Sequence, residues 1–179
     1  MPNQKNYNGS ACPAIARQAV ETFIKTKETI QPPKDAGNLL NSEAGVFVTI
    51  EKGDELRGCI GTYMPVQKNI CLEIIHNAIS AASADSRFTP IAEEELPDLS
   101  YSVYLLDLPE LATRVSELDP DKYGIMVMAD GKSGLLLPGL PGIHKIEDQL
   151  AIVCRKAGIN PKEENITIYR FTADKFSEK

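Results

Sequence analysis

One short segment holds the side chains in this sequence that are best suited to chemistry. The segment Leu56–Gly61 (Leu-Arg-Gly-Cys-Ile-Gly) is predicted to be a strand, and alternate side chains of a strand point to opposite faces. One face suits a protein core and holds Leu56, Gly58 and Ile60. The other face places the Arg57 guanidinium two residues from the Cys59 thiol, and Gly61 has no side chain to cover that thiol. Because a fixed positive charge favours thiolate over thiol, this face predicts an accessible, activated cysteine.

Two interpretations of this strand stay open at this stage. In the first, Cys59 and Arg57 are catalytic, with the thiol as a nucleophile or as a group that contacts a ligand. In the second, the strand is tightly packed, and Gly58 is there to let a helix or a second backbone approach closely. Glycines in a strand weaken it, so both interpretations must explain why Gly58 and Gly61 are present.

Four other residues are candidates for ligand binding. Arg87 either binds an anionic group or pairs with Asp85 and merely orders the loop that follows a predicted helix. Asn77, on that helix, is expected to cap or brace the same loop. His144 precedes a later helix and would exchange a proton with Cys59 only if the two halves of the chain face each other.

The cysteines predict neither a metal site nor disulfides. They are Cys12, Cys59, Cys71 and Cys154, and no two of them form a Cys-x-x-Cys pair. That spacing argues against a zinc cage, and free thiols in a reducing cytosol are the simplest interpretation. The sequence identifies no particular cofactor.

Composition and charge narrow the class of protein and its partners. With 42% apolar and 25% charged residues, the 179-residue chain has the composition of a globular protein. Its net charge of −6 repels a phosphate backbone, so we expect no nucleic-acid partner. No apolar run approaches the ~20 residues that span a bilayer, and the polar N-terminus lacks a signal peptide's apolar stretch. We expect a cytoplasmic protein without a membrane partner.

Two parts of the chain show the same predicted order of elements. The first part has strands at 45–51 and 55–63, a helix at about 66–83 and a strand at 100–107. The second part has strands at 124–129 and 134–138, a helix that ends at Gly158 and a strand at 165–172. Gly53-Asp54 and Asp130-Gly131 form the hairpin turns. We therefore predict a duplicated ββαβ unit, at about 44–107 and 123–172.

The fold class that follows is α+β, with antiparallel or mixed sheets, helices packed on the sheets and an extra N-terminal helix. Ser10 is expected to cap that first helix, and Pro13 lies in its first turn. Residues 1–10 are predicted to be a flexible arm, and 11–179 a single domain made of the two units. On the helix at 66–83, a solvated polar face is expected to hold Glu73, His76, Ser80 and Ser83.

The hexapeptide at Leu56–Gly61 resembles the hallmark of the AMMECR family, which includes a form called AmmeMemoRadiSam system protein A. The resemblance covers roughly residues 12 to 177. Further segments similar to the family pattern are Ala44–Thr49, Asp85–Phe88 with Pro90, Glu95–Leu99, Gly134–Pro138 and Arg155–Gly158. Ser86 departs from the pattern, where the family commonly has proline, and so does His144, where an acidic residue is expected.

The resemblance implies a fold similar to the duplicated α+β arrangement, and it implies partners. Family members accompany a Memo-type protein and a radical-SAM-type protein, and are sometimes fused to the former. The resemblance therefore favours a binding module that works with these proteins through Leu56–Gly61 and takes a small-molecule or peptide ligand. The alternative is an enzyme, or an enzyme subunit, that uses Cys59 as an activated thiol in a cleft.

Overall fold

The computed structural model describes residues 9–178, and the chain divides into two compact units. Unit 1 consists of Met1–Leu106 and Asp174–Lys179, and unit 2 consists of Asp107–Ala173. Unit 2 is thus inserted, along the chain, between two parts of unit 1.

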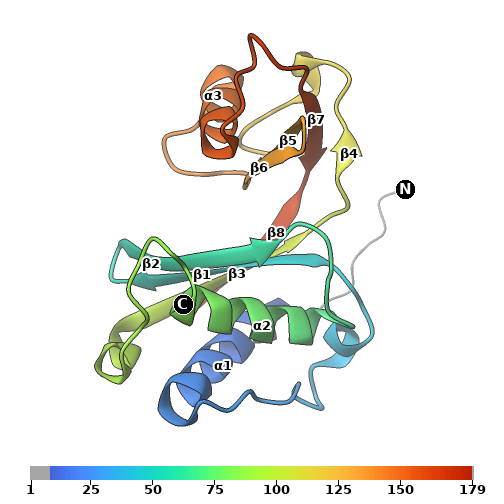
Figure 1. The fold of residues 1–179 in the computed structure, drawn as a ribbon. Coiled ribbons are helices and arrows are strands. Elements are labelled where there is room, and N and C mark those ends of the chain that lie inside the picture. Colours follow the sequence, from blue (N-terminus) through green and yellow to red (C-terminus); the bar gives the residue numbers. More distant parts are fainter. Residues whose placement is uncertain (1–8, 179) are drawn as a thin grey trace. The chain divides into compact units, whose positions relative to one another are not determined.

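Unit 1 is built on a four-stranded sheet with the strand order β2-β1-β3-β8 (Figure 1). The strands are β1 (Gly45–Lys52), β2 (Glu55–Thr62), β3 (Leu99–Leu106) and β8 (Ala173–Ser177). The central strand β1 pairs antiparallel with β2 and with β3, which leaves β2 at one edge of the sheet.

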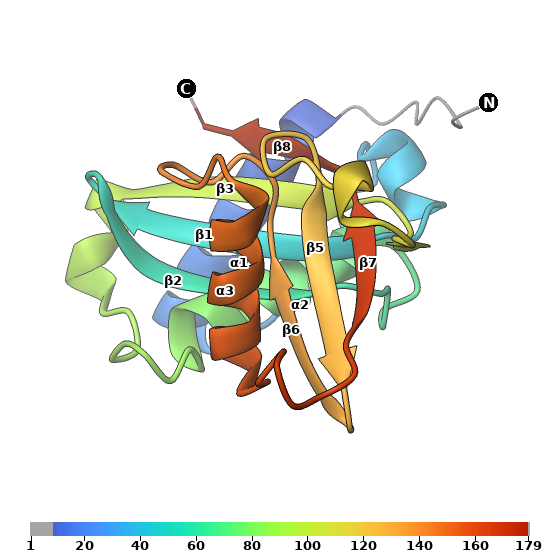
Figure 2. The same ribbon diagram turned by 90° about the horizontal axis from the view of Figure 1, so that it is seen from above.

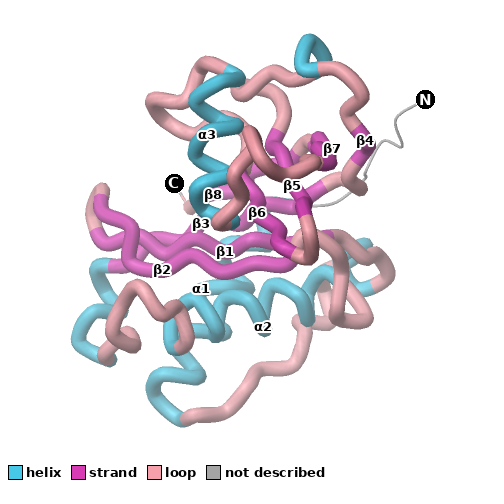
Figure 3. Tube along the Cα trace, turned by 45° about the horizontal axis from the view of Figure 1, so that its top comes forward, coloured by secondary structure: helices cyan, strands magenta, loops and turns pink. Residues whose placement is uncertain are grey.

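Two helices, α1 (Cys12–Thr26) and α2 (Ile70–Ser83), cover one face of this sheet (Figures 1 and 3). Alternation along β1 points Val46, Val48 and Ile50 into the core beneath the helices, where all three are fully buried. Short 3-10 turns precede α1 (η1, Gly9–Ala11), β1 (η2, Gly37–Leu40) and β3 (η3, Glu93–Asp98).

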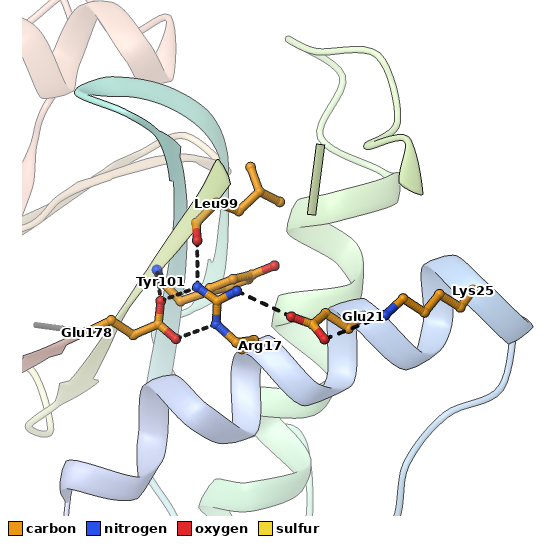
Figure 4. Close-up of polar contacts among 6 residues, drawn as sticks. All are labelled: Arg17, Glu21, Lys25, Leu99, Tyr101 and Glu178. Carbon is orange, nitrogen blue, oxygen red and sulfur yellow. Dashed lines mark hydrogen bonds and ion pairs between the residues drawn. The ribbon is translucent and has the colours of Figure 1, made fainter. Parts of the chain in front are cut away.

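The last described residue fastens the C-terminal end of the chain to α1 and β3 (Figure 4). The Glu178 carboxylate accepts hydrogen bonds from Nε and Nη2 of Arg17 at 2.7 and 2.8 Å, and from the Tyr101 amide at 3.0 Å. The Glu178 amide in turn donates to the Tyr101 carbonyl at 3.1 Å. These bonds hold the end of the chain in unit 1.

Unit 2 has a second four-stranded sheet with the strand order β4-β7-β5-β6. Its elements are β4 (Glu110–Leu111), the 3-10 turn η4 (Val115–Glu117), β5 (Gly124–Ala129), β6 (Lys132–Leu136), α3 (Ile146–Ala157) and β7 (Thr167–Phe171). Helix α3 lies along β6 and β5 (Figure 2), and the fully buried Ile125, Val127 and Val153 form the centre of the unit's core.

The predicted α+β class is confirmed. Both units contain the succession strand, strand, helix, strand, as β1-β2-α2-β3 and β5-β6-α3-β7, and the corresponding strand orders in the sheets are β2-β1-β3 and β6-β5-β7. Gly158 ends α3 in the left-handed conformation, as predicted. That the two units arose by duplication stays a prediction, as does the division into an arm and one domain. Of the predicted arm, residues 1–8 lie outside the described part, whereas Gly9 and Ser10 begin η1.

Several predicted details are wrong, for local reasons. Helix α1 has Ala11 at its N-cap instead of Ser10, although Pro13 does lie in its first turn. Helix α2 begins at Ile70 instead of residue 66, because the Asn69 side chain accepts a hydrogen bond from the Leu72 amide and so caps the helix there. Glu73 is fully buried, whereas His76 is exposed as expected.

Candidate functional site

A β-bulge in β2 sets the direction of the side chains in the hexapeptide. Gly58 pairs with Ile50 and Leu56 with the next residue, Glu51, so Arg57 is the extra residue on β2. Strict alternation therefore fails at this point. Leu56, which alternation assigns to the core face, is 42% exposed.

Cys59 lies beyond the bulge, on the face of the sheet opposite the helices. It pairs with Thr49 on β1, and its half-buried Sγ lies 3.4 Å from the Thr49 hydroxyl oxygen. The neighbouring pair on this face is Gly61 and Phe47, and a Cβ at Gly61 would collide with the Phe47 ring. Gly61 is therefore covered by the Phe47 ring.

Gly58 lies on the helix side of the same strand. A Cβ at this position would collide with the backbone carbonyl of Ala81, in the last turn of α2. The close helix approach predicted for Gly58 is the arrangement found.

Asp85 and Arg87, in the loop after α2, together bind both backbone groups of Cys59. The Asp85 carboxylate accepts the Cys59 amide at 2.9 Å, and Nη2 of Arg87 donates to the Cys59 carbonyl at 3.0 Å. The two side chains also pair with each other, through Nε and Nη2 of Arg87 at 2.9 and 2.7 Å. We call these three residues the Cys59 clamp. At the edge of the sheet, the clamp pairs the amide and the carbonyl of Cys59, which a further strand could otherwise bind.

Arg57, on β2, binds a later part of the same loop. Its Nε and Nη2 form a forked pair with Glu95 at 3.0 and 2.9 Å, and its Nη1 donates to the Thr89 carbonyl at 2.8 Å. Nη2 also reaches the Pro90 carbonyl. With a side chain only 14% exposed, Arg57 fastens the loop to β2.

The two ion pairs shift the pKa values of their acids. The hydrogen bond from Arg87 is the largest cause that lowers the pKa of Asp85 to about 2, and the Cys59 amide adds to it. The hydrogen bond from Arg57 is the largest cause that lowers the pKa of Glu95 to about 2. The pKa of Arg87 is raised, first by Asp85 and also by Cys59, so this guanidinium is a permanent cation.

Asn77 belongs to a buried polar cluster beneath the end of β2. Its amide donates to the Val46 carbonyl and to the Thr62 hydroxyl. The buried Glu73 carboxylate, one turn earlier, accepts the Thr62 hydroxyl at 2.6 Å and the amides of Val66 and Gln67 at 2.9 and 2.7 Å. These bonds hold Val66 and Gln67 in the loop between β2 and α2, which agrees with the start of α2 at Ile70 instead of residue 66.

His144 lies in unit 2, where its Nδ1 is 2.9 Å from the Asp121 carboxylate and both side chains are exposed. A proton exchange between His144 and Cys59 stays a prediction.

The other thiols are buried. Burial raises the pKa of Cys12 to about 12, and it raises those of Cys71 and Cys154. Between residues 9 and 178, no group of three or more His, Cys, Asp or Glu side chains is placed to hold a metal ion. No helix in the same part of the chain is long and apolar enough to span a membrane.

Most of the predicted site residues are thus brought to β2 or its edge. They are Arg57, Gly58, Cys59, Gly61, Asn77, Asp85 and Arg87. Sequence reasoning missed Thr49, Glu73 and Glu95. Thr49 and Glu95 lie in two of the segments that resemble the family pattern. Glu73 lies four residues from both Asn69 and Asn77, a spacing that places all three on one side of α2.

Comparison with known proteins places these motifs in a family. The AMMECR1 family model matches residues 13–176. A Thermotoga maritima protein is 42% identical over 163 residues, which cover 90% of this chain and 94% of that protein. A Clostridium acetobutylicum protein is 43% identical over 166 residues, 92% of this chain but only 35% of the relative.

The fold also matches a solved structure. The crystal structure of an uncharacterized protein from Pyrococcus horikoshii has a TM-score of 0.89 and 36% sequence identity, and the match covers 96% of this chain and 91% of that one. With a family model and relatives that span almost the whole sequence, the chain belongs to the AMMECR1 family.

Proposed function

We propose that this chain is a ligand- or partner-binding module that works with Memo-type and radical-SAM-type proteins through the strand Leu56–Gly61. The proposal rests on one observation above all. Two separate motifs meet at Cys59, because Asp85 and Arg87 bind its amide and its carbonyl. The clamp fixes the backbone while it leaves the thiol half-buried beside the Thr49 hydroxyl, which is the arrangement of a preorganised contact surface.

The saturation of Arg57 supports binding over catalysis. Its side chain is bound by Glu95, Thr89 and Pro90, so its role is to hold the loop after α2 against β2. The group within hydrogen-bonding distance of the Cys59 sulfur is the Thr49 hydroxyl, which is neutral and therefore a weak base for a thiol.

The Clostridium relative supports the proposal of protein partners. The matched segment makes up 35% of that protein, so a domain of this family there shares a chain with a larger stretch of other sequence. A domain that is joined to other sequence in one organism is a good candidate for a separate, associating subunit in another.

A binding experiment with a bulky substitution tests this proposal. Affinities of the purified Memo-type and radical-SAM-type proteins of the same organism would be measured by calorimetry for the native chain and for Cys59→Phe. We expect Cys59→Phe to weaken binding of at least one partner about tenfold or more, because a phenyl group obstructs the contact face. Val115→Ala, an exposed apolar position in unit 2, is the matched control and should bind like the native chain. No binding to the native chain, or equal binding to Cys59→Phe, would contradict the proposal.

The alternative function, an enzyme that uses Cys59 as an activated thiol, is favoured by a different observation. The Cys59 thiol is half-buried while the other three cysteines are buried, and the Arg87 guanidinium binds the backbone carbonyl of the same residue. If this alternative holds, Cys59→Ser should abolish turnover of a substrate but leave its binding intact. If the binding module is correct, Cys59→Ser changes binding alone.

A further inference from the structure

We infer that the site at Cys59 takes a ligand that carries an oxyanion, such as a carboxylate or a phosphate group, and that Arg87 is the residue that binds it. This inference rests on the proposed function, since it names the chemistry of the ligand at the same site.

The two arginines at this edge of the sheet differ in what they leave available. All three guanidinium nitrogens of Arg57 are bound, and its side chain is only 14% exposed. Arg87 uses Nε and Nη2 for Asp85 and for the Cys59 carbonyl, and its side chain is 53% exposed. Within residues 9–178, no hydrogen bond found for Arg87 uses Nη1. Arg57 is therefore structural, whereas Arg87 has a donor edge to offer.

Arg87 is also held in place before any ligand arrives. Asp85, whose side chain is only 4% exposed, accepts the amides of Cys59 and Arg87 in addition to the guanidinium. The carboxylate cannot leave without breaking these bonds, so the guanidinium keeps its orientation. Binding by a side chain that is already ordered loses less conformational entropy.

The remaining donors suit an oxyanion by their chemistry. A guanidinium presents its N–H groups in a plane that matches carboxylate and phosphate oxygens, and it is less tightly hydrated than an ammonium group. The Asp85 carboxylate already accepts hydrogen bonds from the Cys59 amide and from Nε and Nη2 of Arg87. An oxyanion at Nη1 would therefore bind the same guanidinium as Asp85, at a different nitrogen. Since Nη2 of the same guanidinium binds the Cys59 carbonyl, such a ligand would lie beside Cys59.

Two alkylating reagents of similar size and different charge test this inference on the whole chain. In both reactions the Cys59 thiolate sulfur attacks the CH₂ carbon, an S–C bond forms, the C–I bond breaks, and iodide leaves with the electron pair. The thiol proton goes to the solvent. Iodoacetate carries a carboxylate and iodoacetamide does not. The ratio of their rates at Cys59, read by peptide mass spectrometry, therefore reports attraction of an anion, and accessibility cancels.

We expect the ratio at Cys59 in the native chain to exceed that in the unfolded chain about threefold or more at low salt, and to fall as salt is added. Arg87→Gln should return the ratio to the unfolded value, and Arg87→Lys should retain part of the increase. Lys25→Gln, which removes one positive charge from α1 on the other face of the sheet, is the control and should keep the native ratio. Thermal melting checks that each variant is folded. Acetate and inorganic phosphate as competitors then show which oxyanion is preferred.

A native ratio no higher than the unfolded one would overturn the inference, and so would a raised ratio that Arg87→Gln leaves unchanged. These failures can be told apart from failure of the proposed function. If partner binding is lost in Cys59→Phe while the reagent ratio is flat, the binding module stands and the oxyanion inference falls. If the ratio is raised and depends on Arg87 while no partner binds, the oxyanion site stands and the partner proposal falls.

Discussion

Cys59 is bound by a carboxylate that lies 26 residues further along the chain, and this single contact joins the two most distinctive motifs of the sequence. The sequence predicted the Arg57 guanidinium near the thiol, whereas Arg57 pairs with Glu95 and it is Arg87 that binds the Cys59 carbonyl. Alternation on a strand led to that assignment, and the β-bulge at Arg57 overturns it. A bulge depends on how two strands pair, so it leaves little trace in the residues of one of them.

At the residue scale, the lowered pKa values of Asp85 and Glu95, both about 2, predict how stability depends on pH. Carboxyl groups in unfolded chains have pKa values of about 4, so each group stabilises the fold fully above that pH. This contribution is lost as the pH falls from about 4 towards 2. The free energy of unfolding in urea should therefore fall less steeply over this window in Asp85→Asn and Glu95→Gln than in the native chain. Ser86→Ala, an exposed neutral position in the same loop, should follow the native curve; equal slopes in all four proteins would contradict the account.

Glu73 gives a second prediction at this scale. Its buried carboxylate accepts the Thr62 hydroxyl and the amides of Val66 and Gln67. Glu73→Ala would leave these donors without their acceptor and should lower the free energy of unfolding by about 3 kcal/mol. His76→Ala, on the exposed side of the same helix, should change it by less than about 0.5 kcal/mol, as measured by chemical denaturation. Similar values for the two variants would show that the cluster does not hold the loop.

At the scale of elements, the second strand of the hairpin in each unit places a glycine against the helix that follows the hairpin. A Cβ at Gly58 would collide with the Ala81 carbonyl in the last turn of α2, and one at Gly134 would crowd Ala157 and the Val153 carbonyl of α3. The same packing device in the same position strengthens the prediction of a duplicated unit.

The two glycines of β2 should respond differently to alanine. Gly58→Ala collides with helix backbone, which cannot move alone, and should lower the free energy of unfolding by about 3 kcal/mol. Gly61→Ala meets the half-buried Phe47 ring, which can rotate, and should cost about 1 kcal/mol or less. Denaturation of both variants checks the order, and a larger loss for Gly61→Ala would contradict it.

The elements that the sequence predicted correctly are those with local signals. Hairpin turns at Gly53 and Gly131, both with positive φ, and the left-handed Gly158 fixed the ends of strands and of α3. Strands β4 and β8 were missed. Strand β4 has only two residues, and β8 is defined by its place beside β3, which is distant in sequence. Such pairing cannot be deduced from a short segment alone.

At the scale of the whole molecule, the chain leaves unit 1 after Leu106 and returns to it at Asp174. The return is secured by Glu178, which pairs with Arg17 and with both backbone groups of Tyr101 (Figure 4). The stability of unit 1 therefore depends on residues at both ends of the chain.

Glu178→Ala should lower the free energy of unfolding of unit 1 by about 2 kcal/mol, since it leaves the Tyr101 amide and the Arg17 guanidinium without this acceptor. Hydrogen exchange should be faster in α1 and β3, while β5 in unit 2 keeps its protection. Glu21→Ala removes the other carboxylate partner of Arg17, which is partly exposed, and should have an effect below about 0.5 kcal/mol. Equal loss of protection in both units would show that Glu178 is not specific to unit 1.

The most direct test of the central claim, that the Cys59 clamp is a contact site, is native-state alkylation of all four cysteines by iodoacetamide, with and without the Memo-type protein. The account predicts that Cys59 reacts while Cys12, Cys71 and Cys154 react only after unfolding, and that the partner slows Cys59 alone. A Cys59 that is as inert as the three buried cysteines, or that reacts at the same rate in the presence of the partner, would contradict it.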